Sequence, residues 1–381
     1  MSPICTAIAA SLSTLMLHPA PTSITASLQQ AETERADLGG GLYMLTGNGG
    51  NILFSTGDDG TFVVDSQFAN VAEQNLELIK EVSDGPIVFV LNTHFHGDHT
   101  GGNKAFYSEG ATIIAHENVR SRLANTPEAR AIDTDTFPVI TFSENTTFYW
   151  NSDEFRVMHA ADAHTDGDAF LYLPKSNVIH TGDLMFAGRY PYVDLGSGGS
   201  VGGAISALEA IHDLADKDTR IVPGHGPLSS RDDVAATITM LQATRALVRA
   251  EMMKGLSRDE VIAADPLAEY NGTWSWRFID GDRMTGTQFD DLMATDAEAK
   301  AAVDAGPAKE AKAVPASATK VTASSDAMIN DDDPQTATTR LEAAQDETEQ
   351  AVNKARSRAA EVIEDLTKIE SDSEDADDPQ Q

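Results

Sequence analysis

The chain has 381 residues and 41% of them are hydrophobic, so it can bury a sizeable core and is not disordered throughout. Its 60 acidic residues outnumber 27 basic ones, and the formal net charge is -33. Nucleic acids and anionic lipid headgroups would be repelled by such a surface, so neither is expected as a partner. Cys5 is the only cysteine, which excludes an intramolecular disulfide and a cysteine-based metal site.

The first 30 residues have the composition of an export leader. Residues 4–17 are apolar or small and carry no charge, and they are too few to span a bilayer. The first basic residue is Arg35, so the positive front end of a usual signal is missing. We expect a leader over 1–30 and a periplasmic or secreted protein, or a cytoplasmic one if this leader is not a signal. No later run of apolar residues is long enough to predict stable insertion into a membrane.

Short strands dominate the pattern from about residue 40. Strands are expected over 41–46, 52–55 and 61–65, with glycine-rich turns between them. Residues 71–82 have helical spacing, and the continuous apolar run 87–91 is typical of a strand covered on both faces.

Strand and helix patterns alternate further along the chain, around 111–115, 119–123, 178–181 and 204–214. A long helix is expected over 230–254, and Ser257 with Glu260 forms a capping box for another. The alternation predicts an α/β protein built in layers, with one domain over 36–295.

The composition changes near residue 296. No aromatic residue follows Phe289, and acidic and small residues dominate, so residues 296–381 are expected to be an acidic, low-complexity tail that does not fold alone. Apolar residues recur at helical spacing within 337–369, which predicts either a transient solvated helix or a weak coiled-coil segment.

A cluster of metal-ligand residues follows the apolar strand 87–91 directly. His94 and His96 are two positions apart, so in an extended chain both side chains point to the same side. Gly97 permits a sharp turn that brings Asp98 and His99 to the other side, where they could serve a second ion. Imidazole and carboxylate ligands favour zinc, with iron or manganese as alternatives.

Three more candidate ligands stand downstream in similar settings. His164, Asp183 and His225 each lie near a glycine where an apolar run ends, which is where loops meet pockets. Such loop ends often carry functional residues.

The histidine-rich segment, the separate histidine, the aspartate after a strand and the late Gly-His-Gly resemble the metallo-β-lactamase-fold hydrolase superfamily, over about residues 38–290. The resemblance implies a four-layer αββα sandwich with metals at one edge of two sheets. It also implies a first zinc ion on His94, His96 and His164, a second on Asp98, His99 and His225, and Asp183 as the bridge.

By this resemblance the chain is a zinc-dependent hydrolase of a small molecule. A hydroxide shared by the two ions would cleave an ester, thioester, lactone or β-lactam-like amide, and Asp98 would orient it and move its proton. Asp183 stands where the commonest penicillin-destroying subgroup has cysteine, which favours the thioesterase and lactonase branches. The alternative is a mononuclear iron oxygenase of persulfides, which shares the same histidine segment. The resemblance leaves the oligomeric state open.

Other polar residues have two interpretations each. Asp65 is either a partner for a histidine ligand or a cap for a turn. Arg189 and Tyr190 follow the bridging aspartate and are candidate substrate contacts, although Arg189 could equally form a surface ion pair. Trp274 and Trp276 are expected to pack the last helix rather than cover the pocket.

The remaining histidines are expected to be structural. A lone histidine is more often packed or exposed than a ligand. This expectation covers His18, His116, His159, His180 and His212.

Overall fold

The structure is a computed structural model, and it describes residues 33–47, 49–125 and 136–307. The expected leader over 1–30 and the helical pattern over 337–369 lie outside these residues.

The first sheet of the described chain has seven strands in chain order. They are β1 (Glu34–Gly39), β2 (Leu42–Thr46), β3 (Ile52–Ser55), β4 (Thr61–Val64), β5 (Ile87–Asn92), β6 (Thr112–His116) and β7 (Ile140–Phe142). Neighbours are antiparallel from β1 to β4 and parallel from β4 to β7. Parallel neighbours need crossovers. Helix α1 (Ala72–Lys80) provides the first, α2 (Gly97–Thr100) with α3 (Asn103–Ser108) the second, and α4 (Glu117–Asn125) lies in the third.

The second sheet has five strands in the order β12-β11-β10-β9-β8. They are β8 (Asn145–Trp150), β9 (Asp153–Ala160), β10 (Asp168–Leu173), β11 (Val178–His180) and β12 (Arg220–Val222). The pairs from β8 to β11 are antiparallel, and β11 pairs with β12 in parallel. The crossover between these last two strands holds the short helices η3 (Gly182–Leu184) and η4 (Leu195–Ser197) and the longer α5 (Val201–Leu214).

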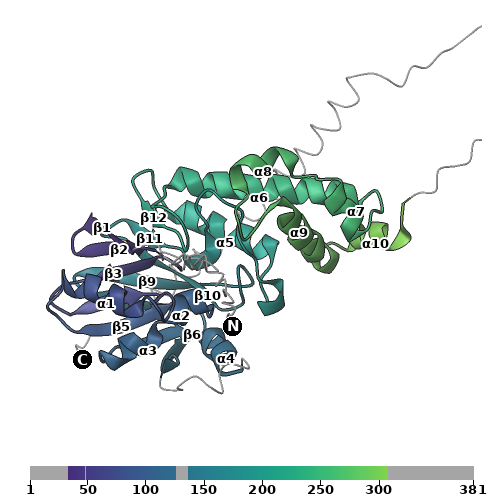
Figure 1. Cartoon of the computed structure of the whole chain (residues 1–381). Helices are drawn as coiled ribbons and strands as arrows, with labels where there is room; N and C mark the ends of the chain where they lie inside the picture. Colours follow the sequence, from purple (N-terminus) through teal and green to yellow (C-terminus); the bar gives the residue numbers. More distant parts are fainter. Residues whose placement is uncertain (1–32, 48, 126–135, 308–381) are drawn as a thin grey trace, which may run out of the picture. The chain divides into compact units, whose positions relative to one another are not determined.

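The two sheets pack face to face. Phe62 and Leu91 of the first sheet share one buried cluster with Phe155 and Leu171 of the second. The Phe62 and Phe155 rings lie 4.8 Å apart between centroids. This apolar layer forms the middle of the sandwich (Figure 1).

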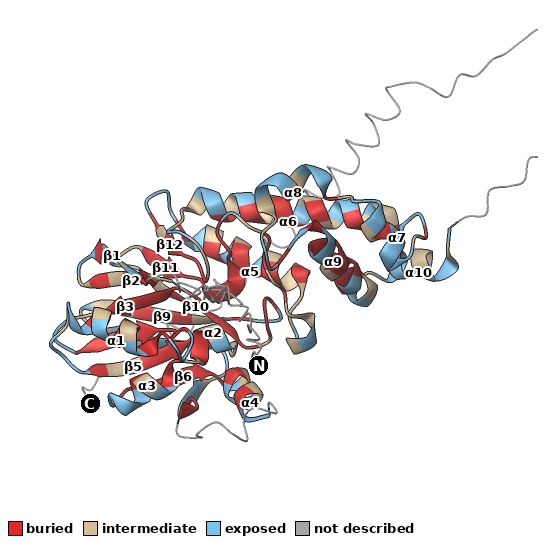
Figure 2. Ribbon diagram, viewed as in Figure 1, coloured by how far each residue is buried: buried red, intermediate tan, exposed pale blue. Residues whose placement is uncertain are grey.

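Helices cover the two outer faces. On the first sheet, Phe54 and Val63 share a cluster with Ile79 of α1 and Phe106 of α3. On the second sheet, residues of β10, β11 and β12 share a cluster with α5 and with α6 (Arg231–Met252). Figure 2 shows the buried residues in the strands and on the inner faces of these helices. The predicted four-layer αββα sandwich is confirmed.

The chain ends its described part in a group of helices. They are α7 (Arg258–Ala263), α8 (Ala268–Trp274), α9 (Gly281–Thr295) and α10 (Ala297–Ala305). The capping box predicted from Ser257 and Glu260 starts α7. No helix in the described ranges is both long and apolar enough to cross a membrane.

The folded part extends beyond both expected ends of the domain. Strand β1 begins at Glu34, before residue 36, and α10 occupies residues that were expected to belong to the acidic tail. The Asp296 carboxylate caps α10 by accepting the backbone N–H groups of Glu298 and Ala299, and Ala299 is fully buried. Arg249 of α6 also donates to Asp296, at 2.7 Å. These contacts anchor α10, although its alanine-rich sequence did not predict that it packs against the domain.

Candidate metal centre

The candidate ligands follow strand ends of both sheets. His94, His96, Asp98 and His99 follow β5 of the first sheet, where the chain enters α2. His164 lies in the turn from β9 to β10, Asp183 in η3 after β11, and His225 in the loop after β12. The structure brings these seven side chains to one edge of the sandwich. We call them the ligand cluster.

The ligand cluster divides into two groups that meet at Asp183. The ligand atoms within each group, His94, His96, His164 and Asp183 in one and Asp98, His99 and His225 in the other, lie within 4.8 Å of one another.

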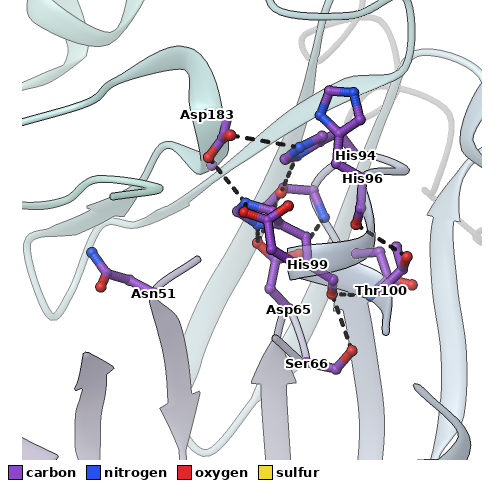
Figure 3. A network of polar contacts seen from close by, with 12 residues as sticks. Asn51, Asp65, Ser66, His94, His96, His99, Thr100 and Asp183 are labelled. Carbon is purple, nitrogen blue, oxygen red and sulfur yellow. Dashed lines mark hydrogen bonds and ion pairs between the residues drawn. The ribbon is translucent and has the colours of Figure 1, made fainter. Parts of the chain in front are cut away.

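The two carboxylate oxygens of Asp183 face different groups. Oδ2 is 3.8 Å from Nε2 of His94 and 3.6 Å from Nε2 of His164. Oδ1 is 3.1 Å from Nε2 of His99 and 3.3 Å from Nε2 of His225. Figure 3 shows Asp183 facing His94 and His99 in this arrangement.

Hydrogen bonds from neighbouring residues orient the imidazoles of His94 and His99. Nδ1 of His99 donates to Asp65 Oδ2 at 2.7 Å. The Thr93 hydroxyl donates to the same oxygen at 2.8 Å and lies 3.1 Å from Nδ1 of His94. Since each Nδ1 bonds away from the cluster, each Nε2 is directed into it.

The imidazoles of His96 and His164 are oriented in the same way. Nε2 of His96 donates to Asp194 Oδ2 at 3.0 Å, and Nδ1 of His164 donates to the Tyr192 carbonyl at 2.7 Å. When both imidazoles are neutral, these outward bonds leave Nδ1 of His96 and Nε2 of His164 without a proton, and these two atoms lie 2.9 Å apart. Two facing lone pairs repel each other unless a cation lies between them.

The inner atoms of the cluster are suited to a cation because they lack other partners. Nε2 of His94, Nε2 of His99 and Oδ1 of Asp183 are buried and have no hydrogen-bond partner. Burying polar atoms in this state costs free energy that a metal ion would recover. The imidazole and carboxylate donors therefore fit a metal-binding site.

Burial lowers the pKa values of several histidines in the cluster, whereas nearby carboxylates raise them. Burial lowers the pKa of His94 well below its ordinary value, and it lowers the pKa of His164 to about 4. Burial also favours neutral His225, but the carboxylates of Asp183 and Asp98 outweigh it and raise the pKa of His225 to about 9. His94 and His164 are thus neutral and ready to coordinate, whereas the carboxylates around His225 attract positive charge.

Two glycines leave room for the cluster. A Cβ atom on Gly50, in the turn between β2 and β3, would lie 2.1 Å from Cε1 of His99. A Cβ atom on Gly224 would lie 2.1 Å from Oδ1 of Asp183. Any side chain at these positions would displace a candidate ligand.

One side of the cluster is open to solvent. The side chains of Asp98, His96 and His225 are 24%, 20% and 17% exposed, whereas His94 is almost fully buried. These three residues therefore form the solvent-exposed side of the cluster.

The two predicted substrate contacts, Tyr190 and Arg189, have different surroundings in the structure. Tyr190 is fully buried, and its hydroxyl donates to Asn271 at 3.1 Å, so its side chain packs in the core and does not face the cluster. Arg189 is half-buried with its guanidinium 5.1 Å from the centre of the Trp276 ring. Trp276 is partly buried against the core, and its indole N–H donates to the Tyr190 carbonyl at 2.9 Å.

The four described histidines outside the cluster make local contacts. His180 lies 3.2 Å from the Asn51 carbonyl, and its Nδ1 accepts the Gly182 N–H. His116 and His159 stack with ring centroids 3.9 Å apart, and His212 contacts Arg231. His18 lies outside the described residues.

Three contributors to the site had no clear signal in the sequence. Thr93 was seen only as part of the histidine segment, and Tyr192 acts through its backbone carbonyl. Asp194 is 98 positions from His96 and stands in no recognisable motif.

A sequence profile of the Metallo-beta-lactamase superfamily matches residues 43–225. The chain is 27% identical over 139 residues to a metallo-beta-lactamase type 2 of Elizabethkingia meningoseptica, covering 36% of this chain and 53% of that protein. It is 28% identical over 144 residues to a hydroxyacylglutathione hydrolase of Pelagibacter ubique strain HTCC1062, covering 36% of this chain and 51% of that protein. The matches thus span about half the length of these curated relatives.

A solved metallo-beta-lactamase from Pontibacter korlensis aligns with a TM-score of 0.48 and 21% identity, covering 55% of this chain and 99% of that chain. The profile match includes the strands and loops that carry all seven residues of the ligand cluster. The chain therefore contains a metallo-β-lactamase superfamily domain that includes residues 43–225.

Proposed function

We propose that this chain is a zinc-dependent hydrolase that cleaves an ester, thioester, lactone or β-lactam-like amide of a small molecule. The observation that carries the proposal is the orientation of the imidazoles around Asp183. Four of them bond outward through one nitrogen and direct the other into the cluster, while the two oxygens of Asp183 face separate groups.

Each group would hold one zinc ion. The first ion would be bound by His94, His96 and His164, the second by Asp98, His99 and His225, and Asp183 would serve both. Bound zinc supplies Lewis acidity to a carbonyl group and makes water acidic enough to act as a nucleophile at neutral pH.

Asp98 is proposed to handle the proton of the attacking water. Its carboxylate Oδ2 lies 3.3 Å from Nε2 of His225, on the open side of the cluster. Burial alone would raise the pKa of Asp98, but nearby His99 and His225 outweigh it and hold that pKa below its ordinary value. Asp98 is therefore ionised at neutral pH, so it can orient a water molecule, accept its proton and pass that proton to the leaving group.

The names of the relatives support two of the candidate bonds. One relative is named for β-lactams and the other for a hydroxyacyl thioester of glutathione. By the family resemblance, an aspartate at position 183 in place of cysteine favours the thioesterase and lactonase branches.

The test combines metal analysis with a substrate panel. Full-length protein is purified, its zinc and iron are quantified, and esters, thioesters, lactones and β-lactams are assayed with and without a chelator. Two zinc ions per chain and hydrolysis that the chelator abolishes would support the proposal. A single iron ion with oxygen uptake on a persulfide would instead identify the mononuclear oxygenase.

A further inference from the structure

Four aromatic side chains form a continuous arc beside the open side of the ligand cluster. They are Phe186, Tyr192, Trp276 and Phe278, and we call them the aromatic arc. Ring centroids are 6.0 Å apart for Phe186 and Trp276, 5.6 Å for Trp276 and Phe278, and 5.4 Å for Phe278 and Tyr192. Two loops that are far apart in the chain thus build one surface.

The aromatic arc touches both groups of ligands. Phe186 stacks on His225 with centroids 4.9 Å apart and an interplanar angle of 18°. Tyr192 lies 5.8 Å from the His96 ring at the other end. His225 and His96 are two of the three partly exposed ligands, so a molecule lying on the arc would reach the open side of the cluster.

Part of the aromatic arc is exposed. Phe278 is 48% exposed, although a large apolar ring gains free energy on burial. Trp276, its neighbour in the arc, is only partly buried. These two rings meet at an interplanar angle of 60° and offer an angled apolar surface to a ligand.

Two arginines lie against the arc. The Arg283 guanidinium is 4.1 Å from the centre of the Phe278 ring and 5.3 Å from that of Tyr192. The Arg189 guanidinium is 5.1 Å from the centre of the Trp276 ring. Stacking on rings fixes the plane of a guanidinium and leaves its N–H edge free to bind a carboxylate.

Both arginines keep their charge available. Within the described ranges neither forms an ion pair, whereas Arg122, Arg156 and Arg249 each bind a carboxylate. One N–H of Arg283 donates to the Phe278 carbonyl at 2.9 Å, which leaves most of its five donors unused.

Two nearby carboxylates have other partners. Asp194 accepts from His96 at 3.0 Å, and Asp280 accepts the backbone N–H of Arg283 at 2.9 Å as the cap of α9. In a chain with a net charge of -33, two arginines without a carboxylate partner beside the cluster point to an acidic ligand.

We propose that the aromatic arc, Arg283 and Arg189 recognise a substrate that carries a carboxylate on an apolar body. The apolar part packs against Trp276 and Phe278, and the carboxylate pairs with Arg283, supported by Arg189. The bond to be cleaved then lies over the open side of the cluster. This inference rests on the proposed hydrolase function only for the cleavage and not for the binding.

The binding test compares 3-phenylpropionate with 3-phenylpropionamide, which differ in charge but share the phenyl body. Calorimetric titration of the zinc-loaded, full-length protein should give about 10-fold tighter binding of the acid, the gain expected for one charge-assisted pair. Arg283→Gln should abolish this preference and leave binding of the amide unchanged. Arg156→Gln is the matched control, because Arg156 pairs with Glu154 on β9, and it should change neither affinity.

Two results would overturn the inference. One is equal binding of the acid and the amide to the unaltered protein. The other is an acid preference that survives both Arg283→Gln and Arg189→Gln, which would mean that the metal ions alone select the carboxylate.

A kinetic test separates this inference from the proposed function. Hydrolysis of 4-nitrophenyl hydrogen glutarate is compared with that of 4-nitrophenyl valerate, which lacks the carboxylate. Arg283→Gln should raise KM for the glutarate about 10-fold and leave the valerate unchanged. If neither ester is cleaved while acid binding still depends on Arg283, the hydrolase proposal loses support and the recognition site stands.

Discussion

The carboxylate of Asp65 lies 2.7 Å from Nδ1 of His99, and both side chains are fully buried. The same carboxylate accepts the backbone N–H and the hydroxyl of Thr93, each at 2.8 Å. Asp65 directly follows β4, whereas Thr93 and His99 follow β5. The buried carboxylate of Asp65 therefore fixes His99, a candidate ligand that follows β5, to the end of the neighbouring strand β4 (Figure 3).

Asp65→Asn should weaken metal binding at the second group. The amide offers one acceptor oxygen in place of two and cannot match the charge that orients His99. We expect zinc affinity there to fall by about 10- to 100-fold, measured by competition with a chromogenic chelator. Asp153→Asn is the control, since Asp153 accepts several hydrogen bonds in the turn region of Lys175 and Ser176. Unchanged zinc affinity in Asp65→Asn would show that this carboxylate does not help His99 to bind the metal.

Gly50→Ala should displace His99, because the added Cβ would lie 2.1 Å from Cε1 of that imidazole. The expected result is a folded protein that retains less zinc at the second group and has at least about 10-fold lower activity. Gly202→Ala is the matched control in α5, where an added Cβ meets nothing within 4 Å. It should keep its metal and gain about 0.5–1 kcal/mol from helix propensity. Equal zinc content in the two variants would show that a side chain at position 50 does not displace His99.

Asp98→Asn should lower kcat by about 100-fold or more, because the amide cannot accept a proton from water. His96→Ala should abolish hydrolysis by removing a ligand of the first group. His212→Ala should stay near the unaltered rate, since His212 contacts Arg231 in another part of the fold. The three variants are compared by steady-state kinetics, with zinc quantified in each sample. Equal rates in all three variants would rule out the ligand cluster as the catalytic site.

Asp296→Asn should reduce stability in a pH-dependent way. Backbone N–H groups of α10, with Arg249, hold the pKa of Asp296 below its ordinary value. A depressed pKa stabilises the fold above the unfolded-state pKa of about 4, and the effect disappears as the pH falls through the folded-state pKa.

Asparagine can still cap the helix, so thermal melts should show only the loss of the charge at the helix N-terminus, about 0.5 kcal/mol for Asp296→Asn at pH 7, and a smaller loss at pH 3. Asp218→Asn is the control, because Asp218 pairs only with its exposed neighbour Lys217 among the described residues. A loss that is the same at both pH values would show that the charge of Asp296 has no part in it.

Much of the fold could be predicted because the local signals were strong. The expected strand 52–55 matches β3, and the long helix expected over 230–254 matches α6 closely. Strands β8 and β9 were not predicted. Asn145, Thr147 and Tyr149 of β8 are exposed in alternation, and that strand lacks the continuous apolar run that marked β5.

The site could be predicted in part for a similar reason. His94, His96, Asp98 and His99 lie in one short segment, so their spacing alone suggests ligands. Asp194 acts across 98 positions, and only the folded chain brings it to His96. Tyr190 is buried with its hydroxyl on Asn271, whereas Tyr192 lies beside the His96 imidazole, and no spacing pattern in the sequence distinguishes these two tyrosines.

The ligand cluster draws residues from both sheets: His99 follows β5 of the first, and His225 follows β12 of the second. An ion held between such residues would act as a cross-link between the two halves of the sandwich. Free zinc at about 100 times its dissociation constant would then add about 2.7 kcal/mol to the free energy of unfolding. The melting temperature of this protein would consequently report the zinc activity of its surroundings.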